Sequence, residues 1–185
     1  TKNIVIAQIK PNADGVLFVN NQTFDYTENG TTWSTAIREL YNALKLAKTQ
    51  SNIKQIWVRT GTYYPKYSAA DDNFGNEAGR DNAFLMLKNV PVYGGFNGSE
   101  TSITQRNGSA RTTLSGDLGA AGNTDNAYHV VVFSGDAGTA ALNGFTVTGG
   151  NANGVGDVTV NSKPISRGVA GGIYLDSASP LLTNI

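Results

Sequence analysis

Cysteine is absent from this sequence, histidine and methionine occur once each, and charged residues make up only 15% of it. The absence of cysteine excludes disulfides and thiolate metal sites, and one histidine cannot form a multi-histidine metal centre. Lysine plus arginine equals aspartate plus glutamate at 14 each, so net charge favours no nucleic acid partner. No apolar run approaches the roughly 20 residues that a membrane-spanning helix needs, so no membrane insertion is expected.

Short apolar segments, by contrast, recur along the chain and are separated by small residues and by many of its 22 glycines. One unit consists of the strand-like segments 129–133 and 141–148, joined by a turn and ended by Gly149 and Gly150. A second unit follows at 172–185. Placing Val132 on Tyr174 brings Leu142 opposite Leu182, so the two units predict one register.

An earlier and more degenerate copy of this unit lies at 83–96. Strands that repeat at regular intervals with small corner residues are typical of a solenoid, in which each turn of chain, or rung, buries its apolar face against the next. We therefore predict an all-β fold, a right-handed parallel β-helix. A β-sandwich is the alternative, since it also consists of short strands with frequent turns.

One helix is predicted within 31–52, where Trp33, Ile37, Leu40, Leu44 and Ala47 fall on one stripe at helical spacing. We expect this helix to cover the open end of the β-helix core, with Trp33 as the plug. The predicted organisation is a strand and loop lead-in over 1–30, the capping helix over 31–52, and rungs over 53–185. We expect the rungs to continue beyond residue 185.

Tyrosines that present their rings to sugar faces are the candidate glycan-binding groups, and an arginine is a candidate contact to an acidic sugar. These candidates are Tyr63, Tyr64, Tyr67 and Arg80. Tyrosines stacked in the core or at corners would show the same sequence pattern. Paired carboxylates suggest a calcium site, at Asp71, Asp72, Asp117 and Asp125. The alternative for these carboxylates is a set of solvated loop residues, because neither pair has the spacing of a known calcium loop.

Five motifs, taken in their order along the chain, show a resemblance to a known family. These motifs are the segments 56–65, 92–101, 114–117, 125–131 and 142–152. Together they resemble the N-terminal part of large bacterial surface proteins with a right-handed parallel β-helix of pectate-lyase-like type. That resemblance implies a secreted or cell-surface location and adhesin-like relatives, many of them cargo of the type IX secretion system. A minority of β-helix relatives are polysaccharide lyases or glycosidases.

The expected function is therefore that of a secreted, cell-surface scaffold, adhesin-like or glycan-binding. Its expected partners are surface glycans, other cell-surface proteins and the secretion machinery, and calcium is the one candidate cofactor. The alternative is the N-terminal part of a polysaccharide lyase or glycosidase whose catalytic rungs lie outside this chain. No catalytic residue is assigned, and His129, at the start of a strand, is expected to have a structural role.

Overall fold

The computed structural model describes residues 8–23, 28–106 and 110–185. Strands dominate it. The first elements in chain order are β1 (Val16–Val19), α1 (Leu40–Ala47), β2 (Gln55–Arg59), β3 (Thr62–Tyr63), the 3-10 turn η1 (Gly79–Asp81), β4 (Phe84–Leu85), β5 (Val92–Phe96) and the 3-10 turn η2 (Ile103–Gln105). The remaining elements are β6 (Thr112–Ser115), β7 (Val131–Ser134), β8 (Ala141–Asn143), β9 (Phe145–Thr148), β10 (Asp157–Val160), β11 (Lys163–Ser166), β12 (Ile173–Asp176) and β13 (Leu181–Thr183).

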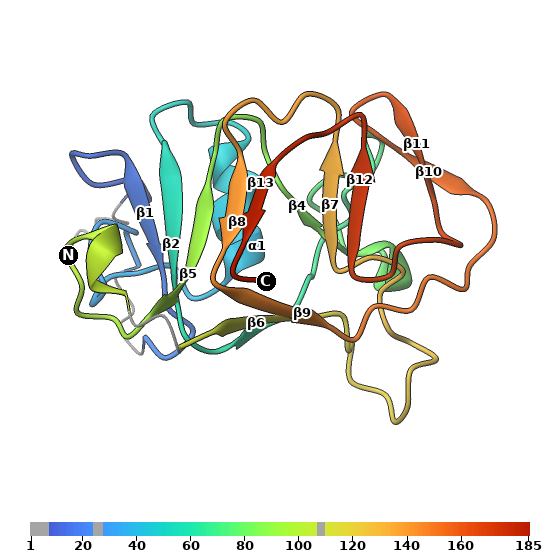
Figure 1. Ribbon diagram of the computed structural model, residues 1–185, viewed down its shortest axis with the longest axis horizontal. Helices are drawn as coiled ribbons and strands as arrows, with labels where there is room; N and C mark the ends of the chain where they lie inside the picture. The colour runs from blue at the N-terminus through green and yellow to red at the C-terminus, as the bar shows by residue number, and fades with distance from the viewer. Residues whose placement is uncertain (1–7, 24–27, 107–109) are drawn as a thin grey trace, which may run out of the picture.

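Three parallel sheets form the framework of the fold. Sheet 1 has the order β1-β2-β5-β8-β13, and its strands stand side by side in Figure 1. Sheet 2 has the order β3-β6-β9, and sheet 3 has the order β12-β7-β4. Every ladder within these three sheets is parallel. The β-sandwich alternative is therefore wrong, because its hairpin-connected strands would pair antiparallel.

The chain passes through the three sheets in a fixed cyclic order. After β2 in sheet 1 it enters sheet 2 at β3 and sheet 3 at β4, and it then returns to sheet 1 at β5. The same order repeats through β6, β7 and β8, and again through β9, β12 and β13. Parallel neighbours require such long crossover connections, because a tight hairpin can join only antiparallel strands.

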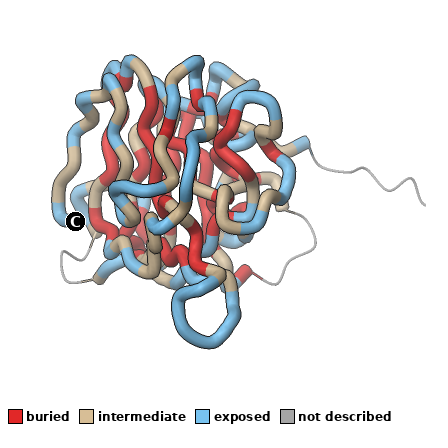
Figure 2. The backbone as a smooth tube through the Cα atoms, turned by 90° about the vertical axis from the view of Figure 1, so that its right-hand side faces the viewer, coloured by how far each residue is buried: buried red, intermediate tan, exposed pale blue. Residues whose placement is uncertain are grey.

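Register places like side chains on top of one another. On the interior face of sheet 1, each member of one aliphatic column is paired with the next, and the column comprises Leu17, Ile56, Val92, Leu142 and Leu182. Val132 lies opposite Tyr174, and Leu142 opposite Leu182, so the predicted register is confirmed. Buried residues gather in the strands and exposed residues in the connecting loops (Figure 2).

Close approach of successive turns explains one pair of corner glycines. A Cβ atom on Gly94 would lie 2.7 Å from the Gly144 carbonyl oxygen, and a Cβ on Gly144 would lie 2.8 Å from the Gly94 carbonyl oxygen. Both distances are too short for a side chain, so glycine lets the backbones of β5 and the corner after β8 meet.

Helix α1 packs against the interior, and it is shorter than the helix that the sequence suggested. Ile37, Leu40 and Leu44 are at most 3% exposed and belong to the main core cluster. The helix begins only at Leu40, because the chain before it pairs with β1 instead: Ile37 N–H donates to the Phe18 carbonyl, and Asn20 N–H donates to the Ile37 carbonyl. This bridge occupies the edge of β1. No helix among the described residues has the length and apolar character needed to cross a membrane.

Trp33 does not plug the core, which corrects the sequence-based expectation. It packs against Phe18 and Phe96 in a second cluster, formed by the residues of β1, β2 and β5 that alternate with the core-facing ones. Because successive side chains of a strand point to opposite faces, this cluster lies on the outer face of sheet 1. The lead-in strand expected at the N-terminus begins in residues 1–7, which lie outside the described residues.

The long insertion 151–169 contains the antiparallel hairpin β10–β11, which the sequence did not reveal. Two carboxylates attach this hairpin to the rest of the fold. Asp71 accepts hydrogen bonds from the backbone N–H groups of Asn161 and Ser162 at 2.8 Å each. Asp81 accepts from Arg167 Nε at 2.7 Å and from Arg167 Nη2 at 3.0 Å, a bidentate pair that fixes the hairpin base.

Candidate binding clefts

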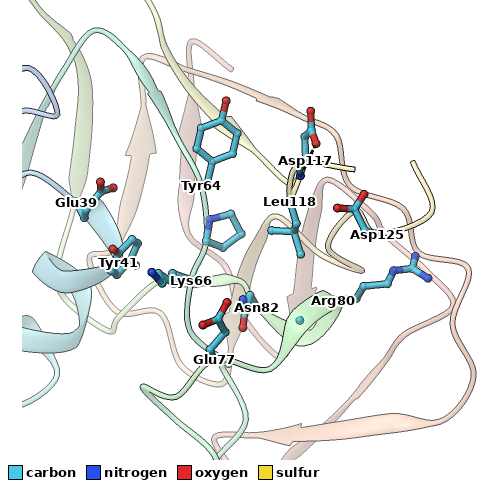
Figure 3. A pocket seen from close by; sticks show the side chains of 13 residues that line it. Glu39, Tyr41, Tyr64, Lys66, Glu77, Arg80, Asn82, Asp117, Leu118 and Asp125 are labelled. Carbon is cyan, nitrogen blue, oxygen red and sulfur yellow. Dashed lines mark hydrogen bonds between the residues drawn. The ribbon is translucent and has the colours of Figure 1, made fainter. Parts of the chain in front are cut away.

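An open cleft of about 630 Å³ lies where helix α1, the chain after β3, the η1 region and the loop after β6 meet (Figure 3). We name it the charged cleft. Its lining residues are Glu39, Tyr41, Tyr64, Pro65, Lys66, Glu77, Gly79, Arg80, Asn82, Asp117, Leu118, Gly119 and Asp125. This volume lies within the range of small-ligand sites in proteins.

Each wall of the charged cleft comes from a different part of the chain. Glu39 and Tyr41 stand at the start of α1, whereas Asp117, Leu118 and Asp125 belong to the loop that follows β6. Tyr64 follows β3 directly and is 48% exposed, so its ring is available to a ligand. Loops that leave one side of a rigid sheet framework are common positions for binding residues.

Arg80 ties two of these loops together. Its Nε donates to the Asn126 carbonyl at 2.7 Å, and its Nη2 donates to the Asn151 carbonyl at 2.8 Å and to Asn153 Oδ1 at 2.6 Å. The guanidinium carbon also lies 4.1 Å from the centre of the Tyr128 ring. Arg80 thus holds the far wall of the charged cleft in place, and two of its three nitrogens are already committed.

Burial at the α1 side alters the acidity of two groups. Burial raises the pKa of Glu39 above its ordinary value of 4.5, an effect that nearby Glu28 reinforces and that Arg38 and Lys66 oppose. Burial, followed by the neighbouring Glu39 carboxylate, raises the pKa of Tyr41 to about 12. Tyr41 therefore stays a neutral hydroxyl near pH 7, and Glu39 holds a proton more readily than a solvated glutamate does.

Four of the eight residues predicted as glycan or calcium ligands meet in the charged cleft: Tyr64, Arg80, Asp117 and Asp125. Tyr63 is not accessible to a ligand, because it is 1% exposed and its hydroxyl donates to the Arg59 carbonyl inside the fold. At this position the alternative interpretation, a tyrosine stacked in the core, is correct. Tyr63 is the buried residue of β3, whereas Tyr64 lies in the chain that follows this strand.

The remaining predicted residues lie elsewhere. Tyr67 packs edge-to-face on Tyr41, with ring centres 4.8 Å apart, and its hydroxyl lies 3.3 Å from Asn42 Oδ1. Asp71 holds the turn of the β10–β11 hairpin, and the adjacent Asp72 is exposed to solvent. The sequence thus grouped side chains that the fold distributes over separate surfaces.

The two carboxylates of the predicted calcium loop are engaged in local turns. Asp117 Oδ1 accepts from Gly119 N–H at 2.9 Å, and Asp125 Oδ2 accepts from Ala120 N–H at 2.8 Å. Asp125 Oδ1 is buried without a hydrogen-bond partner among the described residues. Within that same part of the chain, no three His, Cys, Asp or Glu side chains come close enough to hold a metal ion. Calcium binding stays a prediction.

Sequence analysis missed Glu39, Tyr41, Lys66 and Glu77 as residues of the same cleft. Glu39 lies within the segment 31–52 in which the sequence predicts a helix. The helix start at Leu40 is what places Glu39 at the cleft wall, and that start depends on the pairing of Ile37 with β1. No local signal in the sequence indicates that pairing.

Comparisons with protein-family models, with curated proteins and with solved structures find no match to this chain.

Proposed function

We propose that this chain forms rungs of a right-handed parallel β-helix in a secreted or cell-surface protein, and that it is an adhesin-like scaffold that binds glycans in the charged cleft. The cyclic passage through three parallel sheets supports the β-helix, together with the stacked columns of like residues. Right-handed crossovers are the rule for parallel strands joined within one sheet. The resemblance to bacterial surface proteins supports the location.

The observation that carries glycan binding is the exposed ring of Tyr64 on the wall of the charged cleft, with polar groups beside it. A sugar can place an apolar face on an aromatic ring while its hydroxyls bond to carboxylates and amides around it. Glu77 and Asp117 supply exposed carboxylates of this kind. Arg80 holds the far wall in advance, which lowers the ordering cost of binding.

The test is a binding screen with the purified protein against a panel of neutral and acidic oligosaccharides, followed by calorimetry. Replacing Tyr64 by alanine removes the ring, and the expected result is about a 3- to 10-fold weaker affinity. Tyr64→Phe is the matched control, because it keeps the ring and should retain most of the affinity. Equal binding by wild type and Tyr64→Ala would contradict this role for the charged cleft.

Glycoside hydrolysis is the second candidate function, and one observation favours it. The charged cleft contains four carboxylates, Glu39, Glu77, Asp117 and Asp125, and burial raises the pKa of Glu39 in the direction that suits a general acid. Release of reducing ends from a polysaccharide by wild-type protein, and its loss in Glu39→Gln, would identify a glycosidase. Binding of a polysaccharide without release of reducing ends would favour the scaffold function over hydrolysis.

A further inference from the structure

A second cleft lies on the outer face of sheet 1, where aromatic side chains of three adjacent strands line up. Phe18 of β1 pairs in register with Trp57 of β2, and Trp57 pairs with Tyr93 of β5. Trp33 joins this ladder from the chain before α1, with its ring centre 4.8 Å from that of Phe18. The aromatic groups of four separate segments thus form one continuous surface.

The chain after β5 folds back beside this surface and makes it concave. The resulting cleft measures about 560 Å³, and we name it the aromatic cleft. Its floor consists of Val16, Phe18, Trp33, Trp57 and Ile103. Its rim consists of Asn12, Asp14, Thr31, Thr32, Gln55, Ser99, Glu100, Thr101 and Ser102. In Figure 1 the turn η2 lies beside β1 and β2, at the end of the molecule marked N.

Both indole N–H groups are already bonded within the protein. Trp33 Nε1 donates to the Glu100 carbonyl at 2.8 Å, and Trp57 Nε1 donates to Gln55 Oε1 at 2.9 Å. These bonds fix the two ring planes. Trp57 is 5% exposed and its ring stacks on Phe96, so the half-buried Trp33 ring is the aromatic surface of the floor that a ligand can reach.

The rim, in contrast, keeps polar groups available. Asn12 Oδ1 accepts from the backbone N–H groups of Asp14 and Val16, and Gln55 Oε1 accepts from Trp57, so both amide carbonyls are occupied. The amide nitrogens of Asn12 and Gln55 and the carboxylate of Asp14 make no hydrogen bond with another described residue. Amide donors and a carboxylate acceptor around an aromatic floor match the vicinal hydroxyls and the apolar face of a sugar ring.

The charged residues that line the aromatic cleft indicate which ligands it can bind. Among the described residues, no lysine, arginine or histidine lines the aromatic cleft, whereas Asp14 and Glu100 do. The Glu100 carboxylate is held by the backbone N–H groups of Asn97, Gly98 and Ser99 at 2.7 to 3.0 Å. Burial alone would raise the pKa of Glu100, but these backbone donors outweigh it and lower that pKa, so the carboxylate is ionised near pH 7. An anionic ligand would therefore be repelled.

From this geometry we infer that the aromatic cleft is a second glycan site, which takes an uncharged saccharide and is separate from the charged cleft. The saccharide packs on the Trp33 ring, and Asn12, Asp14 and Gln55 bind its hydroxyls. The inference goes beyond the proposed function, because the two clefts share no residue and differ in their charged groups.

Tryptophan fluorescence reports on this site selectively, because the only two tryptophans of the chain, Trp33 and Trp57, both line it. The experiment titrates the whole chain with neutral hexasaccharides of glucose, mannose and xylose, with polygalacturonate, and with an aromatic-rich peptide. The expected result is a saturable change in tryptophan emission with at least one neutral hexasaccharide and none with polygalacturonate. The inference would be overturned if only the peptide changed the emission, or if none of the ligands changed it.

Three variants separate this site from the charged cleft. Asp14→Ala changes an exposed rim residue and should weaken neutral saccharide binding about 10-fold or more, the effect of losing one hydrogen bond to a charged acceptor. Asp72→Ala, an exposed carboxylate away from both clefts, should bind as wild type does. Tyr64→Ala should leave the fluorescence titration unchanged while it weakens binding in the charged cleft. An unchanged titration with Asp14→Ala would contradict the assignment of the rim.

Discussion

The strands at the two ends of the parallel sheets differ sharply in how far their apolar side chains are buried. At the end near α1, the edge of β1 is occupied by the bridge to Ile37, and Leu40 of the helix is fully buried. At the opposite end, β12 and β13 are the outermost strands of sheets 3 and 1, and Leu175 and Leu181 are 45% and 63% exposed.

Neighbouring strands in sheet 3 show where this difference originates. Phe133 of β7 lies directly opposite Leu175 of β12, yet Phe133 is 2% exposed. Strand β7 has a neighbour on each side, whereas β12 has only one. Burial in this fold therefore depends on being stacked between two strands more than on the hydrophobicity of the residue itself.

The largest effect is expected at the doubly stacked strand. Phe133→Ala should lower the free energy of unfolding by about 3 to 5 kcal/mol, because it leaves a cavity in the core. The partner residue provides the matched control: Leu175→Ala should cost about 1 kcal/mol or less. Urea denaturation of both variants measures the two values. Equal costs would show that stacking does not control burial.

An intermediate effect is expected where the helix covers the interior. Leu40→Ala should cost about 2 to 5 kcal/mol, since Leu40 is 0% exposed and belongs to the main core cluster. Leu181→Ala, on the outermost strand of sheet 1, should change stability by about 0.5 kcal/mol or less. Thermal and urea denaturation can compare them. A Leu40 variant as stable as the Leu181 variant would contradict a covering role for α1.

The smallest effect concerns pH at the junction of β7 and β12. His129 is buried, its ring packs edge-to-face on Tyr174, and burial lowers the pKa of His129 below its ordinary value of 6.5 despite the opposing charge of Asp81. The unfolded chain then binds a proton more readily than the native protein does. Stability should therefore decrease as pH falls from about 7 to about 5.

Replacing His129 by glutamine removes this group, so the variant should lose less stability than wild type over that interval. Urea midpoints at both pH values measure the difference between the two proteins. Identical decreases would assign the pH dependence to groups other than His129.

The pairing of the last two strand units could be predicted from sequence, because the segments that pair there resemble one another. The pairing of Val132 with Tyr174 follows from comparing two segments of the same chain, and so does that of Leu142 with Leu182. The helix start could not be predicted in this way. Its amphipathic stripe extends back to Trp33, but competition from the edge of β1 removes the first part of the stripe from the helix.

The sites were predictable only in part, for a related reason. Tyr64 and Asp117 could be suspected from residue type and loop context, but Glu39 reaches the same cleft through the helix start. The aromatic cleft combines Trp33, Trp57 and Ser99, which are distant in sequence and share no motif. A linear pattern records neighbours along one segment, whereas these clefts arise between segments.

The parallel register has a consequence for how the chain folds. Paired residues such as Ile56 and Val92, or Val92 and Leu142, are separated by several tens of residues, so each new ladder requires closure of a long loop. Proteins dominated by such distant pairings reach the native state slowly. Each added strand needs the preceding one as its template, so the structure can grow in one direction, starting from the end that α1 covers. A translocated or newly synthesised chain that emerges N-terminus first would present its strands in the order in which they are needed.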